Sequence, residues 1–259
     1  MNIIEALEVS KELAIKAGEE IMSIYHTDFS VEYKDDKMPL TLADQKANDI
    51  IVEGLCGNFP EVGILSEESA DDPANRYKEY CFIVDPLDGT KEFINKNDEF
   101  TVNIALAKNG AVIMGVVYLP VKKELYFAAQ GYGAYLNSMG EDKKISVSEK
   151  TDALKLVVSK SHMSEKEEQL LSIHSERIKT MVKAGSSLKG CLVASGEADI
   201  YYRFGLTMEW DTAAMQAVCE EAGAIFRQID GSEMTYNRED HLNKKGFYVI
   251  NREENLMSL

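Results

Sequence analysis

The chain has 259 residues, of which 45% are hydrophobic, and a formal net charge of −16 from 44 acidic and 28 basic side chains. This length and composition suffice for one large globular domain or two small ones. The excess of acids argues against a nucleic-acid-binding protein, so any attraction for an anionic ligand must be local, most simply through a bound metal ion.

Two amphipathic helices are predicted near the N-terminus. In the first, over residues 3–24, apolar and small residues recur at alternating steps of three and four. The charged, proline-containing segment 31–40 predicts a mobile loop or a short hairpin. The second helix begins at Thr41, and Thr41 with Asp44 fits a capping pattern. Taken alone, Asp44 is therefore explained as a structural cap.

Acidic residues follow two predicted strands. The strand over 62–65 leads into Glu67, and the apolar strand over 80–84 leads into Asp85-Pro86-Leu87-Asp88-Gly89-Thr90. Because sites collect at the carboxyl ends of strands in α/β sheets, Glu67 could join Asp85 and Asp88 in one oxygen cage. Paired carboxylates must take up a proton or bind a cation, and oxygen ligands favour Mg²⁺ or Mn²⁺. The alternative is a solvated acidic turn.

The rest of the first half is predicted to be mainly strands. A short helix over 91–94 would point its amino end at the acidic turn, where it suits a phosphate. Strands follow over 100–108, 111–118 and 124–129, the first two joined by an Asn109-Gly110 hairpin turn. Gly131-Tyr132-Gly133 is interpreted as a turn and not as a dinucleotide loop.

The second half alternates strands with helices, which predicts α/β layering. The polar stretch 137–152 is the candidate boundary, dividing the chain into residues 1–150 and 151–259. Asp211 lies at the start of a helix that runs to Glu221, where an acid is commonly a cap. The last nine residues predict a frayed tail. Strands are expected over 153–158, 177–182, 200–203, 224–228 and 246–250, and helices over 165–173 and 188–194.

The sequence has no clear pattern for a signal peptide, a membrane span or a disulfide framework. The start of the chain lacks the basic flank and apolar core of a signal peptide, and no apolar run approaches about 18 residues. We therefore expect a cytoplasmic protein, with peripheral contact at the inner face of the membrane left open. The cysteines form no C-x-x-C pair and predict reduced thiols, mostly in the core: Cys56, Cys81, Cys191 and Cys219.

Three blocks together resemble the signatures of the inositol monophosphatase-like superfamily of metal-dependent phosphatases. They are Glu67-Glu68-Ser69, the stretch from Asp85 to Thr90, and Trp210-Asp211. Within that superfamily, residues 85–106, 185–192 and 209–214 are similar to the CysQ-type 3'(2'),5'-bisphosphate nucleotidases. In one departure, Met38-Pro39-Leu40-Thr41 stands where this branch often has a run like Ser-Pro-Val-Thr.

The resemblance implies a layered α/β/α/β/α sandwich, α+β in the first half and α/β in the second. It also implies a Mg²⁺-dependent hydrolase that converts adenosine 3',5'-bisphosphate to AMP in sulfur metabolism and is inhibited by Li⁺. The alternatives are an inositol monophosphatase or a sugar bisphosphatase on the same metal cage, and a non-catalytic metal or nucleotide sensor. A small-molecule nucleotide is the expected partner of a monomer or homodimer.

Residue roles in the first half follow from the same resemblance. The metal ligands for two or three Mg²⁺ ions would be the side chains of Glu67, Asp85, Asp88 and Asp211 and the carbonyl of Leu87. Thr90 and Asp44 would activate the attacking water, so that Asp44 is more than a cap. The backbone amides of Gly89 and Thr90 would bind the scissile phosphate.

Substrate selectivity is expected in the second half. Ser186, Lys189 and Arg203 match nucleotide contacts of this branch, and cationic side chains suit a second phosphate that no metal covers. His162 lies in a family-like block and would border the base. For each of these residues, a solvated surface side chain is the alternative. Further substrate contacts are expected from the first half and from Asp211: Glu67, Leu87, Asp88, Gly89, Thr90 and Asp211.

Overall fold

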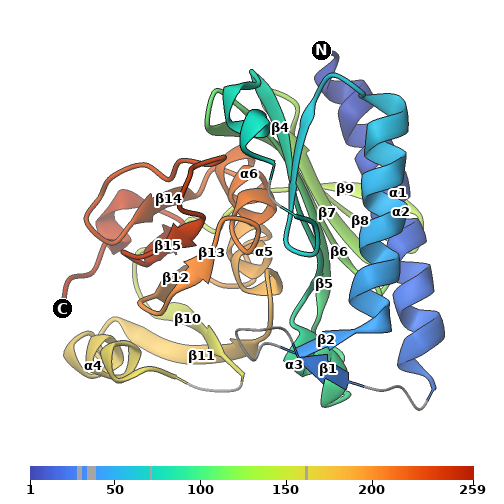
Figure 1. Ribbon diagram of the computed structural model, residues 1–259. Helices are drawn as coiled ribbons and strands as arrows, with labels where there is room; N and C mark the ends of the chain where they lie inside the picture. Colours follow the sequence, from blue (N-terminus) through green and yellow to red (C-terminus); the bar gives the residue numbers. More distant parts are fainter. Residues whose placement is uncertain (28–30, 34–38, 71, 161–162) are drawn as a thin grey trace.

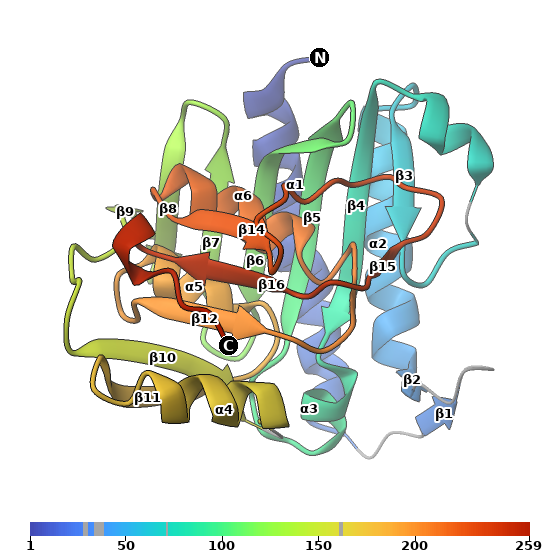
Figure 2. The ribbon, with the colours of Figure 1, turned by 90° about the vertical axis from the view of Figure 1, so that its left-hand side faces the viewer.

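The computed structural model describes residues 1–27, 31–33, 39–70, 72–160 and 163–259. Its elements form five layers: a helix pair, a seven-stranded sheet, a second helix pair, a five-stranded sheet and an outer helix (Figure 1). The predicted layered α/β/α/β/α sandwich is therefore confirmed. Figure 2 looks onto the five-stranded sheet with the larger sheet behind it.

The seven-stranded sheet runs in sequence order from β3 to β9. Only its first pair, β3 with β4, is parallel, and the later neighbours are antiparallel. Asn109 and Gly110 both have positive φ angles, 49° and 81°, as a two-residue hairpin of the expected kind requires. The strands are β3 (Gly63–Ser66), β4 (Tyr80–Asp88), β5 (Thr101–Lys108), β6 (Ala111–Leu119), β7 (Glu124–Ala129), β8 (Gly133–Ser138) and β9 (Glu141–Ile145).

Side-chain alternation sends neighbouring strand residues into different cores. Phe82 and Val84 of β4 pack under the helices α1 (Ile3–Tyr25) and α2 (Leu42–Asn58). Ile83, between them, faces the central helices α5 (Leu188–Ala194) and α6 (Ala213–Glu221). Both faces of the sheet are covered from β4 to β7, which explains why these strands are mainly apolar.

The second half builds a five-stranded sheet in the order β11, β10, β12, β16, β14. Its inner face packs on α5 and α6, and its outer face forms a smaller core with α4 (Glu165–Ile173). The strands are β10 (Leu154–Ser159), β11 (Ile178–Ala184), β12 (Ile200–Arg203), β14 (Ile225–Gln228) and β16 (Phe247–Ile250). The remaining elements are the hairpin β1 (Val31–Tyr33) and β2 (Pro39–Thr41), η1 (Pro73–Tyr77), α3 (Thr90–Ile94), the pair β13 (Thr207–Met208) and β15 (Leu242–Asn243), and η2 (Glu253–Asn255).

Helix α6 lies directly on the larger sheet. A Cβ atom at Gly115 of β6 would come within 2.3 Å of the carbonyl oxygen of Ala214, at the start of α6. Only a residue without a side chain allows this approach. The approach brings the turn that precedes α6, with Asp211 in it, toward the end of β4.

The polar stretch 137–152 contains the end of β8 and all of β9, whose charged side chains lie on an exposed edge strand. Two local predictions were wrong. The C-terminal residues are not frayed: Asn255 is fully buried and its amide donates to the carbonyl of Lys150 and to Asn251 Oδ1. Strand β4 does not end before Asp85 but continues to Asp88.

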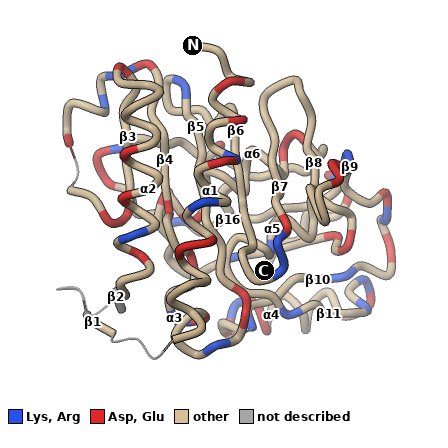
Figure 3. The backbone as a smooth tube through the Cα atoms, turned by 90° about the vertical axis from the view of Figure 1, so that its right-hand side faces the viewer, with Lys and Arg blue, Asp and Glu red and all other residues tan. Residues whose placement is uncertain are grey.

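Other expectations about the surface and the thiols can be checked directly. Across the described parts of the chain, no helix is both long enough and apolar enough to cross a membrane. Figure 3 shows acidic positions interspersed with basic ones on the side of α1 and α2. The four cysteines are free thiols; Cys56 is exposed and the other three are buried.

Candidate metal and phosphate site

A β-bulge brings Asp85 and Asp88 to the same side of β4. Asp85 pairs with Asn103 and Asp88 with Thr101, so three steps along β4 match two steps along β5. In a regular strand, residues three apart point to opposite faces, and one extra residue restores a common side. Pro86 contributes by lacking an N–H group for the ladder. The local sequence thus builds the pair of carboxylates into a strand instead of a turn.

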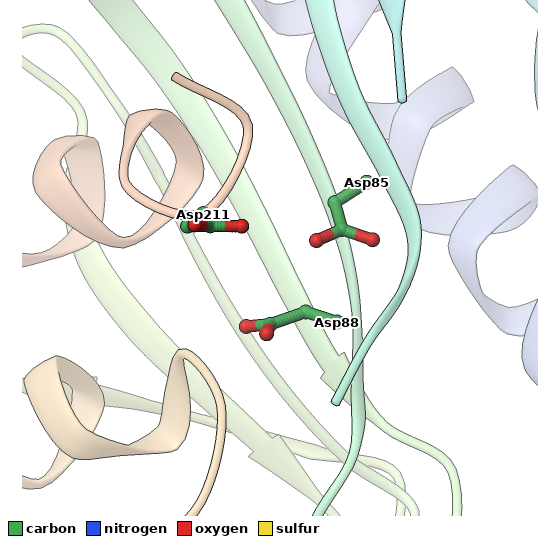
Figure 4. Close-up of side chains that lie close together, drawn as sticks. All are labelled: Asp85, Asp88 and Asp211. Atoms are coloured by element: carbon green, nitrogen blue, oxygen red, sulfur yellow. The ribbon is translucent and has the colours of Figure 1, made fainter. Parts of the chain in front are cut away.

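The third carboxylate comes from the second half of the chain. Carboxylate oxygens of Asp85, Asp88 and Asp211 all lie within 4.8 Å of one another. Figure 4 shows the three side chains turned toward a common space, two from β4 and Asp211 from the turn that leads into α6. Glu67, just after β3, lines the same cavity of about 180 Å³, as does Leu87.

Asp85 and Asp211 each accept a backbone hydrogen bond on one carboxylate oxygen. Asp85 Oδ1 accepts a hydrogen bond from the Leu87 amide (3.1 Å). Asp211 Oδ2 accepts one from the Met208 amide (2.7 Å), so Asp211 orients its own turn and does not cap α6, whose N-cap residue is Thr212. Within the described ranges, the second oxygen of Asp85 and of Asp211 has no hydrogen-bond donor in the structure. Oxygens held in this way fit a hard divalent cation.

Asp88 accepts more hydrogen bonds from side chains than Asp85 or Asp211 does. Its Oδ2 atom accepts hydrogen bonds from Ser187 Oγ (2.9 Å), Thr101 Oγ1 (3.3 Å) and Asn103 Nδ2 (3.3 Å). The sequence reasoning missed these three donors. Thr101 and Asn103 carry a detectable signal, because they are polar residues two apart in an otherwise apolar strand and must share a face. Ser187 carries no such signal.

Burial and mutual repulsion shift the pKa values of this cluster upward. Burial raises the pKa of Asp85 well above its usual range, and the charges of Glu67 and Asp88 raise it further. Burial and the charge of Asp88 raise the pKa of Asp211 to about 8, while the amide of Met208 opposes the shift. Carboxylates that resist ionising together are stabilised by a cation among them, so the residues present fit a metal site.

Asp44 and Thr90 meet beside the carboxylates. Thr90 Oγ1 lies 3.1 Å from Asp44 Oδ1 and donates to it. The other oxygen, Oδ2, accepts from both the amide and the hydroxyl of Thr41, which completes the predicted capping box of α2. Asp44 is therefore both the cap and a partner of Thr90. Burial raises its pKa, while its hydrogen bonds with Thr41 and Thr90 oppose the rise.

A second cavity, of about 200 Å³, adjoins the first, and Asp88, Gly89 and Asp211 line both. Lys189 and Arg203 supply its cationic side chains. Burial lowers the pKa of Lys189, and the nearby Asp88 opposes that shift. The partly buried lysine and the arginine can bind an anion here, beside the acidic side chains of Asp88, Glu92 and Asp211 that also line the cavity.

Two predicted substrate contacts, Ser186 and His162, differ from the others in what the structure shows of them. Ser186 lines the second cavity, but its hydroxyl also lies 2.8 Å from the carbonyl oxygens of Asp88 and Glu99, so it supports the end of β4. His162 lies outside the described residues, as does Met38 of the departing loop. The structure thus brings together every other predicted site residue around the two adjoining cavities and Asp44.

The fold and the paired cavities define a class of metal-dependent phosphatases, and sequence comparison agrees. Residues 3–255 match the model of the inositol monophosphatase family, and the chain belongs to that family. Members of this family use divalent metal ions, and the carboxylates of Asp85, Asp88 and Asp211 are grouped closely enough to hold one.

Individual members of the family differ in how similar they are to this chain. The chain is 42% identical to the 3'(2'),5'-bisphosphate nucleotidase CysQ of Salmonella typhimurium, over 94% of this chain and 98% of the relative. The crystal structure of CysQ from Bacteroides thetaiotaomicron is 41% identical and superposes with a TM-score of 0.85, over 96% of this chain and 98% of that one. An inositol monophosphatase from Thermotoga maritima is 26% identical with a TM-score of 0.81, over 95% and 92%.

Proposed function

We propose that this chain is a Mg²⁺-dependent phosphatase that hydrolyses the 3'-phosphate of adenosine 3',5'-bisphosphate to give AMP and phosphate. One observation carries the proposal: a cavity lined by carboxylates shares lining residues with a second cavity, which Lys189 and Arg203 line. A substrate with two phosphates needs such a pair of sites. The identity to curated nucleotidases supports the same substrate.

The metal ligands in this proposal are Glu67, Asp85, Asp88 and Asp211, with the carbonyl of Leu87. Five ligand groups suit two or three Mg²⁺ ions. When bound, such ions neutralise charge on the transferring phosphate and lower the pKa of bound water. The amides of Gly89 and Thr90, which line the same cavity, would orient the scissile phosphate.

The attacking water would be held by Thr90 and Asp44. Because the Thr90 hydroxyl donates to Asp44 Oδ1, its lone pairs remain available to accept a proton from water. Asp44 is itself fixed by Thr41, so the pair is held in one orientation before substrate arrives. As the water attacks phosphorus in line with the 3'-oxygen, its proton would pass to Thr90 while Thr90 gives its own to Asp44. The bond from phosphorus to the 3'-oxygen breaks, and that oxygen takes up a proton from solvent to leave as the 3'-hydroxyl of AMP.

Lys189 and Arg203 would bind the 5'-phosphate, the group that no metal covers. Ser186 borders the same cavity. Cations beside the carboxylates would lower the raised pKa values of Asp85 and Asp211, and a phosphate beside Lys189 would raise its lowered pKa, so each ligand favours the charged form of the groups that bind it.

A substrate panel tests the proposal. Purified protein with Mg²⁺ should release phosphate from adenosine 3',5'-bisphosphate faster than from inositol 1-phosphate or fructose 1,6-bisphosphate at equal concentration, and millimolar Li⁺ should inhibit it. Replacing Arg203 with Gln should raise KM for the nucleotide by about 10-fold or more, because one charge-assisted contact is lost.

The outcomes separate the candidates. A preference for the inositol ester or the sugar bisphosphate would replace the proposed substrate and keep the metal chemistry. Nucleotide binding without turnover would indicate a sensor. As a control, Lys179→Gln on the exposed side of β11 alters a charge outside both cavities and should leave KM unchanged.

Three further properties are inferred from the sequence. We expect a cytoplasmic enzyme, a monomer or homodimer, and a division into residues 1–150 with most metal ligands and 151–259 with the nucleotide contacts. Size-exclusion chromatography with light scattering would measure the oligomeric state.

A further inference from the structure

We infer that Ser187, which lies between Asp88 and Asp211, is a positioning residue that fixes the metal-binding orientation of Asp88. The inference rests on the proposed metal role of these two aspartates. Ser187 lies between them, at the point where the second half of the chain meets the end of β4.

The hydroxyl of Ser187 does not cap the helix that it precedes. Ser187 is the N-cap residue of α5, and a serine there commonly accepts a hydrogen bond from the first turn of its helix. In this structure no such capping bond forms. Instead, Ser187 Oγ lies 2.9 Å from Asp88 Oδ2 and 3.2 Å from the carbonyl oxygen of Asp211. The side chain is 2% exposed, so water does not replace these contacts.

The available protons determine the direction of each bond. Asn103 Nδ2 donates to Ser187 Oγ at 2.9 Å, so the hydroxyl oxygen is already an acceptor. Its single proton then goes to Asp88 Oδ2, which is closer than the Asp211 carbonyl and carries the charge. Asn103 also donates to Asp88 Oδ2. Asp88 Oδ2 is thereby occupied, and Oδ1 is left for a cation.

Ser187 differs from the other donors to Asp88 in its place in the chain. Thr101 and Asn103 belong to β5, beside Asp88 in the same sheet, whereas Ser187 belongs to the second half of the chain. It therefore sets the position of Asp88 relative to the turn that carries Asp211. Partners that orient metal ligands commonly contribute about 10-fold to 100-fold in metal affinity.

The experiment measures Mn²⁺ binding without substrate, by the loss of the free-ion signal in electron paramagnetic resonance. Ser187→Ala should weaken Mn²⁺ binding by about 10-fold or more. Ser187→Cys keeps the side-chain size and a weak donor, so it should give an intermediate loss and provides a second variant if the alanine protein folds poorly. Ser195→Ala, at the other end of α5, is the matched control and should bind as the wild type does.

A double-mutant cycle separates positioning from general loss of packing. If Ser187 acts through Asp88, the Ser187→Ala change should have little further effect on Mn²⁺ binding in an Asp88→Asn background. Equal losses in both backgrounds would overturn the inference, and so would unchanged Mn²⁺ binding by Ser187→Ala and Ser187→Cys. Absence of Mn²⁺ binding by the wild type would instead overturn the proposed metal site itself.

Discussion

At the scale of single residues, Asp44 combines a role in folding with its proposed role in chemistry. Its Oδ2 atom completes the cap of α2, and its Oδ1 atom faces Thr90. Capping predicts a stability defect on mutation, whereas proton transfer predicts a rate defect. The two contributions can be separated because they use different oxygens.

Replacing Asp44 with Asn should lower kcat by at least about 100-fold, because the amide cannot accept the proton that Thr90 passes on. The one remaining oxygen can still cap α2, so the free energy of unfolding should fall by only about 1 kcal/mol. Steady-state kinetics and denaturant unfolding measure the two effects, and Mn²⁺ binding should persist.

The control for this variant is Ser164→Ala, which removes the same type of capping box from α4, a helix whose residues line neither cavity. It should cost about 1 kcal/mol of stability and leave kcat unchanged. A kcat for Asp44→Asn within a few-fold of the wild type would mean that Asp44 is only a cap.

Contiguous motifs allowed the carboxylates to be predicted, whereas their supporting residues could not be. Asp85 and Asp88 stand out because two acids follow an apolar run. Ser187 is one serine among several, and its role depends on Asp88 lying opposite it across nearly 100 residues of chain. Contacts of that kind are created by the tertiary fold and leave no local pattern.

At the scale of elements, the junction between β4 and α3 depends on Gly89. Its φ angle is 94°, a left-handed conformation that residues with a side chain rarely adopt. An added Cβ would also lie 2.3 Å from Ser186 Oγ. The junction therefore has neither conformational nor steric room for a side chain.

Gly89→Ala should destabilise the protein by more than about 1 kcal/mol and lower kcat, because both the backbone and the Ser186 contact must shift. Gly57→Ala is the matched control, since Gly57 is helical and no atom lies within 4 Å of the added Cβ. That change should be neutral or stabilising by up to about 1 kcal/mol. Similar melting temperatures for the two variants would contradict the argument.

Most helices and strands could be predicted, since periodicity and turn residues are local. The predictions for α4, α5 and β12 match the structure to the residue. The bulge in β4 was missed because strand propensity does not reveal a register shift. The C-terminal tail was misjudged because buried asparagines such as Asn255 resemble surface residues until their partners are known.

At the scale of the whole molecule, the two halves share one core. The largest hydrophobic cluster joins Ile83 and Val117 of the first half to Val218 and Val249 of the second. The division at residue 150 therefore stays a prediction about function, and the proposed metal site lies where the halves meet. Its charges should consequently influence the stability of the entire fold.

We expect the metal-free protein to lose stability as pH rises from about 5 to 8. In the folded state the pKa of Asp211 is raised from 3.8 to about 8, and that of Asp85 is raised well above 3.8. Folding therefore favours the protonated forms, whose stabilising contribution is full below the unfolded pKa and is lost as pH approaches the folded one. The lowered pKa of Asp230 acts only at more acid pH.

Melting temperatures measured in EDTA across this pH range check the expectation. Asp211→Asn should flatten the decrease by a few degrees, since about 1 kcal/mol corresponds to about 2–4 °C in a protein of roughly this size. Asp49→Asn, an exposed acid on α2, should keep the wild-type slope. Saturating Mg²⁺ should also flatten it, because the ion stabilises the ionised carboxylates. Equal slopes for wild type and Asp211→Asn would show that ionisation of Asp211 does not cause the loss of stability with rising pH.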